Sequence, residues 1–161
     1  MKNTLFLISA AAVATLAVSC GGSPAGPSTA LPSPSAGLSG AWAGTGVDSQ
    51  GSTVVTWALT QAGNTVSGTV KTDAVNPNDG SCHSCHRRKS GSVIGTISGT
   101  ALTVVMSFAA GLDDDPTPIC SSTFTATAAA TAGDTLTAAY TGEDSCEGAF
   151  LNGTLTMARQ H

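Results

Sequence analysis

Two cysteines and two histidines stand close together in the middle of the chain, in the run Cys82-His83-Ser84-Cys85-His86. A C-x-x-C-H run is the sequence to which haem c is attached through two thioethers, with His86 as the proximal iron ligand. Two other interpretations are open. A Cys82–Cys85 disulfide could pin a long loop, or two thiolates and two imidazoles could form a tetrahedral zinc or copper site, from Cys82, His83, Cys85 and His86. We favour the disulfide and expect no cofactor.

A second pair of cysteines, Cys120 and Cys146, lies nearer the C-terminus. If the strands on either side fold about residues 131–134, these two positions come within one residue of facing each other. Exported proteins meet oxidising conditions, in which an even number of cysteines is typical of disulfides. The spacing therefore predicts a Cys120–Cys146 disulfide, reached through a small bulge.

Other polar groups give no catalytic set. The two central histidines lie inside the cysteine run, so no Ser-His-Asp arrangement can be built, and no pair of carboxylates is placed for hydrolysis. We interpret residues 87–89 as a solvated basic loop and Glu143, Asp144 and Glu147 as a solvated turn. The net charge is −4 and 10% of residues are charged, which argues against a nucleic-acid partner. We therefore predict that the chain is not an enzyme.

The N-terminal residues read as an export signal. Met1 and Lys2 precede an apolar stretch over residues 5–18 that is too short to span a bilayer, and Leu16-Ala17-Val18-Ser19-Cys20 follows its core. This pattern resembles a bacterial lipoprotein signal with its lipobox, which implies cleavage after residue 19 and lipidation of Cys20. Residues 20–37 are rich in Pro, Ser and Gly, and predict a disordered tether.

Residues 38–161 show the alternation of β-strands and no helical period. Val55, Trp57 and Leu59 would share one face of a strand. Three segments repeat a pattern of two apolar residues flanking Gly-Thr, at 66–70, 93–97 and 151–155, and a strand glycine leaves room for a bend or a bulky neighbour. Strands are expected at 39–47, 52–61, 65–73, 91–98, 101–109, 120–130, 135–142 and 149–159.

Eight short strands joined mainly by tight turns predict an all-β domain, a small antiparallel up-and-down barrel that leaves no open sheet edge. A β-sandwich is the alternative. The opening Gly40-Ala41-Trp42 and the late Arg159 resemble the calycin group of lipocalins and avidin-like barrels. That resemblance implies that Trp42 closes the barrel floor and Arg159 packs over it. The resemblance does not extend to biotin binding, because avidin-like sites use several tryptophans and this domain has two, Trp42 and Trp57.

Together these features predict a protein held in the bacterial cell envelope by a lipid anchor, at the outer membrane or periplasmic face. Its barrel would bind a small apolar ligand or a protein partner without catalysis. The alternative is a lipoprotein that carries haem c at Cys82, Cys85 and His86, for electron transfer or haem sensing.

Overall fold

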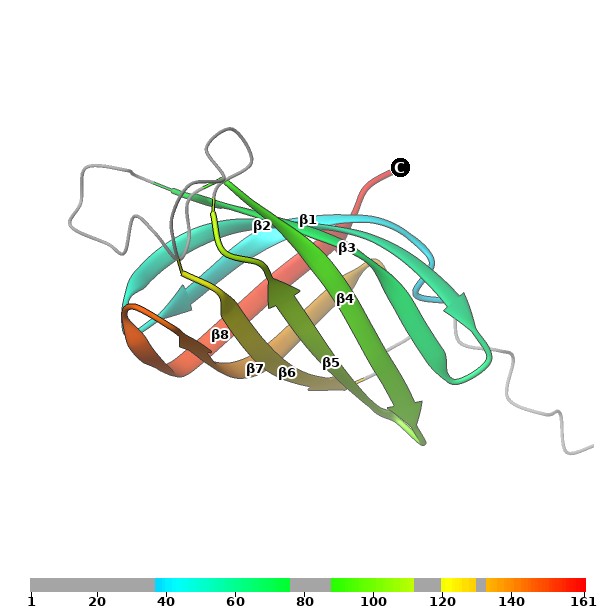
Figure 1. Ribbon diagram of the computed structural model, residues 1–161. Coiled ribbons are helices and arrows are strands. Elements are labelled where there is room, and N and C mark those ends of the chain that lie inside the picture. The colour runs from blue at the N-terminus through cyan, green and yellow to red at the C-terminus, as the bar shows by residue number, and fades with distance from the viewer. Residues whose placement is uncertain (1–36, 76–87, 112–119, 130–132) are drawn as a thin grey trace, which may run out of the picture. The chain divides into compact units, whose positions relative to one another are not determined.

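The computed structural model describes residues 37–75, 88–111, 120–129 and 133–161. These residues form eight antiparallel strands and no helix, so the fold is all-β (Figure 1). The strands are β1 (Gly40–Asp48), β2 (Gly51–Ala62), β3 (Thr65–Ala74), β4 (Lys89–Ser98), β5 (Ala101–Phe108), β6 (Ser122–Ala129), β7 (Thr135–Asp144) and β8 (Gly148–Arg159). A search of the same residues for a membrane-crossing helix finds none of the necessary length and hydropathy.

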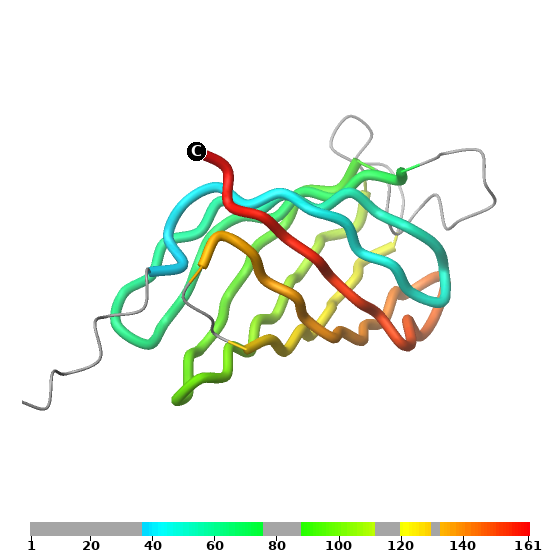
Figure 2. The backbone as a smooth tube through the Cα atoms, turned by 180° about the vertical axis from the view of Figure 1, so that it is seen from behind, coloured from blue at the N-terminus to red at the C-terminus, as the bar shows by residue number. Residues whose placement is uncertain are grey.

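Each strand pairs with the next along the chain, and β1 also pairs with β8, which closes the sheet into a barrel. Figure 2 shows β8 lying between β1 and β7 at this closure. Trp42 on β1 faces Trp57 on one side and Arg159 on the other. The predicted up-and-down barrel is confirmed, and the β-sandwich alternative is wrong.

Alternation along each strand decides which side chains fill the barrel. The predicted row of Val55, Trp57 and Leu59 points inward, and each of these side chains is at most 6% exposed. The outward positions between them carry small aliphatic and hydroxyl side chains such as Thr56 and Ala58, which are exposed. Aliphatic side chains, the two tryptophans and a group of aromatic rings therefore form one continuous core.

Strand glycines lie where the barrel interior is most crowded. A Cβ on Gly68 would come within 2.0 Å of the Ala58 carbonyl oxygen, so the backbone of β2 approaches closely there. Other glycines lie beneath rings of the adjacent strand, and the facing pairs are Gly91 with Phe108, Gly142 with Phe124, and Gly153 with Tyr140. The expectation that strand glycines make room for a bulky neighbour is confirmed at Gly153.

Replacing Gly153 by alanine should destabilise the barrel, because the new Cβ would lie 2.6 Å from the Tyr140 ring. Overpacking of this kind costs about 1–3 kcal/mol, which urea unfolding followed by circular dichroism can measure. Gly133→Ala is the matched control, because nothing lies within 4 Å of a Cβ there. Equal stability of the two variants would show that Tyr140 does not rest on Gly153.

Candidate functional site

Arg159 and Trp42 close one end of the barrel, which we call the floor. The Arg159 guanidinium carbon lies 4.4 Å from the centre of the Trp42 ring, so the predicted pair is confirmed. The same guanidinium donates hydrogen bonds to the backbone carbonyls of Ser39 and Gly37, and to Asp134 Oδ1 at 3.1 Å. Arg159 thus ties the segment that enters β1 to the start of β7.

Leu38 completes the floor from inside. Its side chain is buried, its carbonyl accepts a 2.9 Å hydrogen bond from Trp42 Nε1, and its N–H donates to Gln61 Oε1 at 2.7 Å. The Trp42 indole N–H and the Leu38 N–H and carbonyl thus all have partners, as buried polar groups usually do, whereas Nε1 of the neighbouring Trp57 is buried without one among the described residues. The floor is therefore sealed by side chains that hold one another in place.

Arg159→Lys should weaken the floor, because an ammonium group cannot reproduce the planar fork that donates to two carbonyls and stacks on Trp42. We expect a loss of about 1–2 kcal/mol in the free energy of unfolding, measured by urea denaturation. His161→Ala is the control, because His161 is 73% exposed and its pairing with Asp134 spans 3.5 Å. A lysine variant as stable as the wild type would contradict the role given to the fork.

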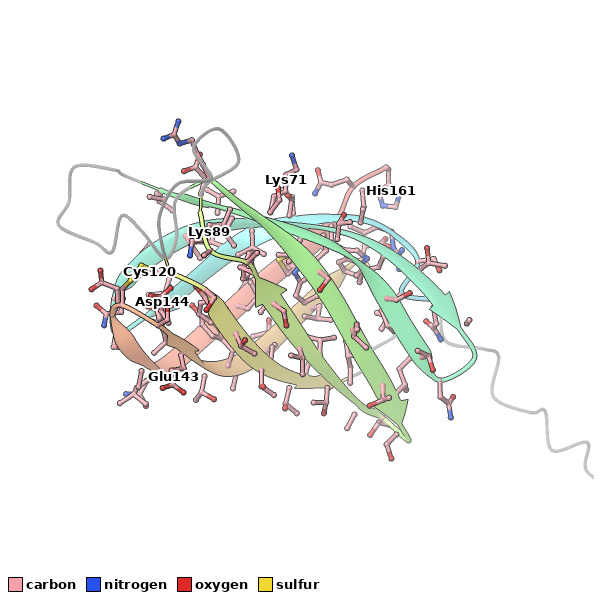
Figure 3. All side chains as sticks on the ribbon, viewed as in Figure 1. Lys71, Lys89, Cys120, Glu143, Asp144 and His161 are labelled. Atoms are coloured by element: carbon pink, nitrogen blue, oxygen red, sulfur yellow. A yellow bond between two sulfur atoms is a disulfide. The ribbon has the colours of Figure 1, made fainter. Side chains whose placement is uncertain are left out.

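The opposite end of the barrel, where β3, β5 and β7 finish, holds a buried polar cluster, and we call this end the loop end. The labelled side chains of Lys89 and Asp144 meet there beside Cys120 (Figure 3). Lys89 Nζ donates to the Cys120 carbonyl at 2.5 Å and to Ser122 Oγ at 3.2 Å. Its distance to Asp144 Oδ2 is 3.6 Å, and the two side chains are 2% and 0% exposed.

Asp144 is held by hydrogen bonds at both carboxylate oxygens. Ser122 Oγ donates to Oδ2 at 2.5 Å, and the backbone N–H groups of Cys146 and Glu147 donate to Oδ1 at 2.9 and 3.3 Å. Burial alone would raise the pKa of Asp144, but these bonds and the nearby Lys89 charge hold it below its usual value. Burial lowers the pKa of Lys89, and Asp144 offsets part of that effect.

The predicted disulfide between Cys120 and Cys146 is confirmed, with a Cα–Cα distance of 5.5 Å. The β6–β7 register differs by one residue from the expected one, because Ser122 faces Asp144. The cysteines lie two residues beyond that pair on each side and so face each other directly. The bulge expected here is therefore wrong. Asp144 lies near both sulfurs, but in a disulfide they offer no thiolate ligands to a metal.

Below the polar cluster lies an internal cavity of about 20 Å³. Apolar groups dominate its wall, and six strands supply the lining, from Thr53, Val55, Thr72, Met106, Phe108, Phe124, Tyr140 and Leu155. The rings meet edge to face, with Phe124 5.9 Å from both Phe108 and Tyr140. Thr72 Oγ1 is buried, and it has no hydrogen-bond partner among the described residues.

Tyr140 carries a polar group out of this aromatic cluster. Its hydroxyl donates to Asp48 Oδ2 at 2.5 Å, which joins β7 to the end of β1. Burial, and then the hydrogen bond and negative charge of Asp48, raise the pKa of Tyr140 above its usual value. The hydroxyl therefore remains a neutral donor whenever Asp48 is ionised.

Two sequence interpretations are corrected at the loop end. Lys89 was expected in a solvated basic loop, and Asp144 in a solvated turn, but both side chains are buried inside the barrel. Lys89 is the first residue of β4 and Asp144 the last of β7, so each strand extends two residues further than predicted. Ser122 joins them as a third member that the sequence did not single out.

Several predicted residues lie outside the described part of the chain. They are the lipidation site Cys20 and the whole C-x-x-C-H run, with Cys82, His83, Cys85 and His86. Their lipid, disulfide, haem and metal interpretations stay predictions from sequence. A comparison with protein-family models, curated proteins and solved structures finds no match for this chain.

Proposed function

We propose that this chain is a lipid-anchored cell-envelope protein whose barrel binds a small, largely apolar ligand at the loop end, without catalysis. The observation that carries the proposal is the apolar cavity that Thr72 helps to line, together with the Thr72 hydroxyl Oγ1, which is buried without a hydrogen-bond partner among the described residues. A buried polar atom without a partner costs about 1–3 kcal/mol, so a ligand that bonds to it gains affinity. This internal site favours a small molecule over a protein partner.

The size of the cavity limits what enters. A volume of about 20 Å³ holds one water molecule or one small group, so a longer ligand needs a side chain to move. Met106 lines the cavity and has the flexible, unbranched side chain best suited to moving aside. The ligand class is therefore a short alkyl chain with one hydrogen-bonding group, entering at the loop end because the floor is sealed.

Butan-1-ol is a suitable probe of this site. We expect it to shift the Met106 methyl signal in ¹H–¹³C NMR spectra, while the methyls of Val105, on the outer side of the same strand, stay in place. Thr72→Val should weaken binding about three- to tenfold, because one hydrogen bond worth about 1 kcal/mol is lost.

Thr69→Val is the matched control, because Thr69 lies on the outer face of the same strand. It should leave the affinity for butan-1-ol unchanged. Shifts confined to exposed methyl groups, or equal affinity in both variants, would rule out this site.

The anchor is tested separately from the ligand. In a bacterium that processes lipoproteins, the chain should incorporate labelled palmitate and sediment with membranes, because several acyl chains on Cys20 give firm attachment. Cys20→Ala should remove the label and release the protein from the membrane fraction. Recovery of the unaltered chain in the soluble fraction without label would exclude lipidation.

A further inference from the structure

The buried cluster of Lys89, Ser122 and Asp144 is separate from the proposed ligand site and has a chemistry of its own. Burial strips water from both charges, and their mutual attraction offsets this cost only in good geometry. Here the lysine nitrogen and the nearer carboxylate oxygen stay 3.6 Å apart, and Ser122 Oγ forms the hydrogen bonds to both. The arrangement therefore brings an amine and a carboxyl group together around a hydroxyl, with both side chains almost fully shielded from solvent.

Ser122 is placed to move a proton between the two charged groups. Its Oγ accepts a hydrogen bond from Lys89 Nζ and donates one to Asp144 Oδ2. Transfer along this path turns an ammonium and a carboxylate into a neutral amine and a neutral carboxylic acid. Burial works toward the neutral pair, because both charges are then removed from a poorly solvated place, whereas the hydrogen bonds to Asp144 keep its pKa low, so the neutral pair is the minor, reactive form.

The other carboxyl oxygen lies where negative charge can be stabilised. Asp144 Oδ1 accepts hydrogen bonds from two backbone N–H groups, those of Cys146 and Glu147, at 2.9 and 3.3 Å. Two fixed backbone donors on one oxygen are the arrangement that stabilises the tetrahedral intermediate of acyl transfer. The disulfide at Cys146 fixes the turn that supplies them.

We propose that Lys89 and Asp144 condense to an isopeptide bond that joins β4 to β7. The lone pair of neutral Nζ attacks Cγ of the protonated carboxyl group, and the electrons move onto Oδ1 between the two N–H donors. The tetrahedral intermediate then collapses, the C–Oδ2 bond breaks, and Ser122 passes the released amine proton to Oδ2, which leaves as water. One amide forms, one water is released, and no oxidant or other reagent is needed.

This bond would add a second cross-link to the loop end, beside the Cys120–Cys146 disulfide. The Cys120–Cys146 disulfide joins the start of β6 to the β7–β8 turn, whereas the isopeptide bond reaches back to β4. Cross-links stabilise chiefly by limiting the unfolded chain. An amide is not cleaved by thiol reductants, so this cross-link also persists under reducing conditions. The inference does not depend on ligand binding or on the lipid anchor.

The test is peptide mapping of the purified full-length mature protein, after denaturation, reduction and alkylation. No Lys or Arg lies between Lys89 and Arg159, and the only glutamates are Glu143 and Glu147. Trypsin with a glutamate-specific protease should therefore give residues 89–143 linked to residues 144–147, lighter by one water than the two peptides together. Free peptides 90–143 and 144–147, with cleavage after Lys89, would overturn the proposal.

Variants distinguish a covalent Lys89–Asp144 bond from a buried ion pair that has not reacted. Lys89→Met should abolish the linked peptide, whereas Lys71→Met, which removes an exposed lysine of β3, should leave it intact. Asp144→Asn should give a linked peptide of the same mass, because ammonia replaces water as the leaving group. Ser122→Ala should slow linkage by about a hundredfold, the usual contribution of a positioned proton donor, and linkage at the wild-type rate in that variant, followed by peptide mapping at successive times after synthesis, would overturn the relay.

Discussion

The pairing of β1 with β8 is the constraint on which the rest of the structure depends. Once the sheet is closed, every inward side chain must fit into a cylinder of fixed width. Most inward positions are therefore Val, Leu, Ala or Thr, and the large rings need room made for them. Glycine supplies that room on the facing strand, beneath Phe108, Phe124 and Tyr140. Closure, small core residues and glycine–ring pairs are thus parts of one packing solution.

The same constraint makes the two ends of the barrel different. At the floor, the Trp42 indole and the Arg159 guanidinium cover the opening. The backbone carbonyls of Gly37 and Ser39, which precede β1, accept hydrogen bonds from Arg159. At the loop end, three rings meet edge to face around Phe124 and leave a small gap against Thr72. Edge-to-face contacts of this kind are the arrangement that aromatic pairs prefer. The cavity lies where the aromatic residues are concentrated.

Most of the fold could be predicted from the sequence, because alternation with a period of two repeats in every strand. The disulfide register shows how far that signal reaches. Phe124 and Tyr140 both point inward, and even-numbered residues continue inward along both strands. Facing residues must point to the same side, so only a register that pairs even with even positions is consistent. The alternation alone therefore predicts the hairpin register that brings Cys120 opposite Cys146. The turn centre expected from the sequence gave a register that differs from it by one residue.

The polar cluster could not be predicted in the same way. Lys89 is in phase with inward Val93, and Asp144 with inward Tyr140, but a charged residue at a strand end ordinarily indicates a solvated turn. What buries them is a partner on another strand, and a single strand's pattern carries no information about that partner. The serine between them is no more recognisable, because a hydroxyl suits either face of a sheet. Pairing across the barrel decides their burial, so these groups become visible only once closure has fixed which strand ends meet.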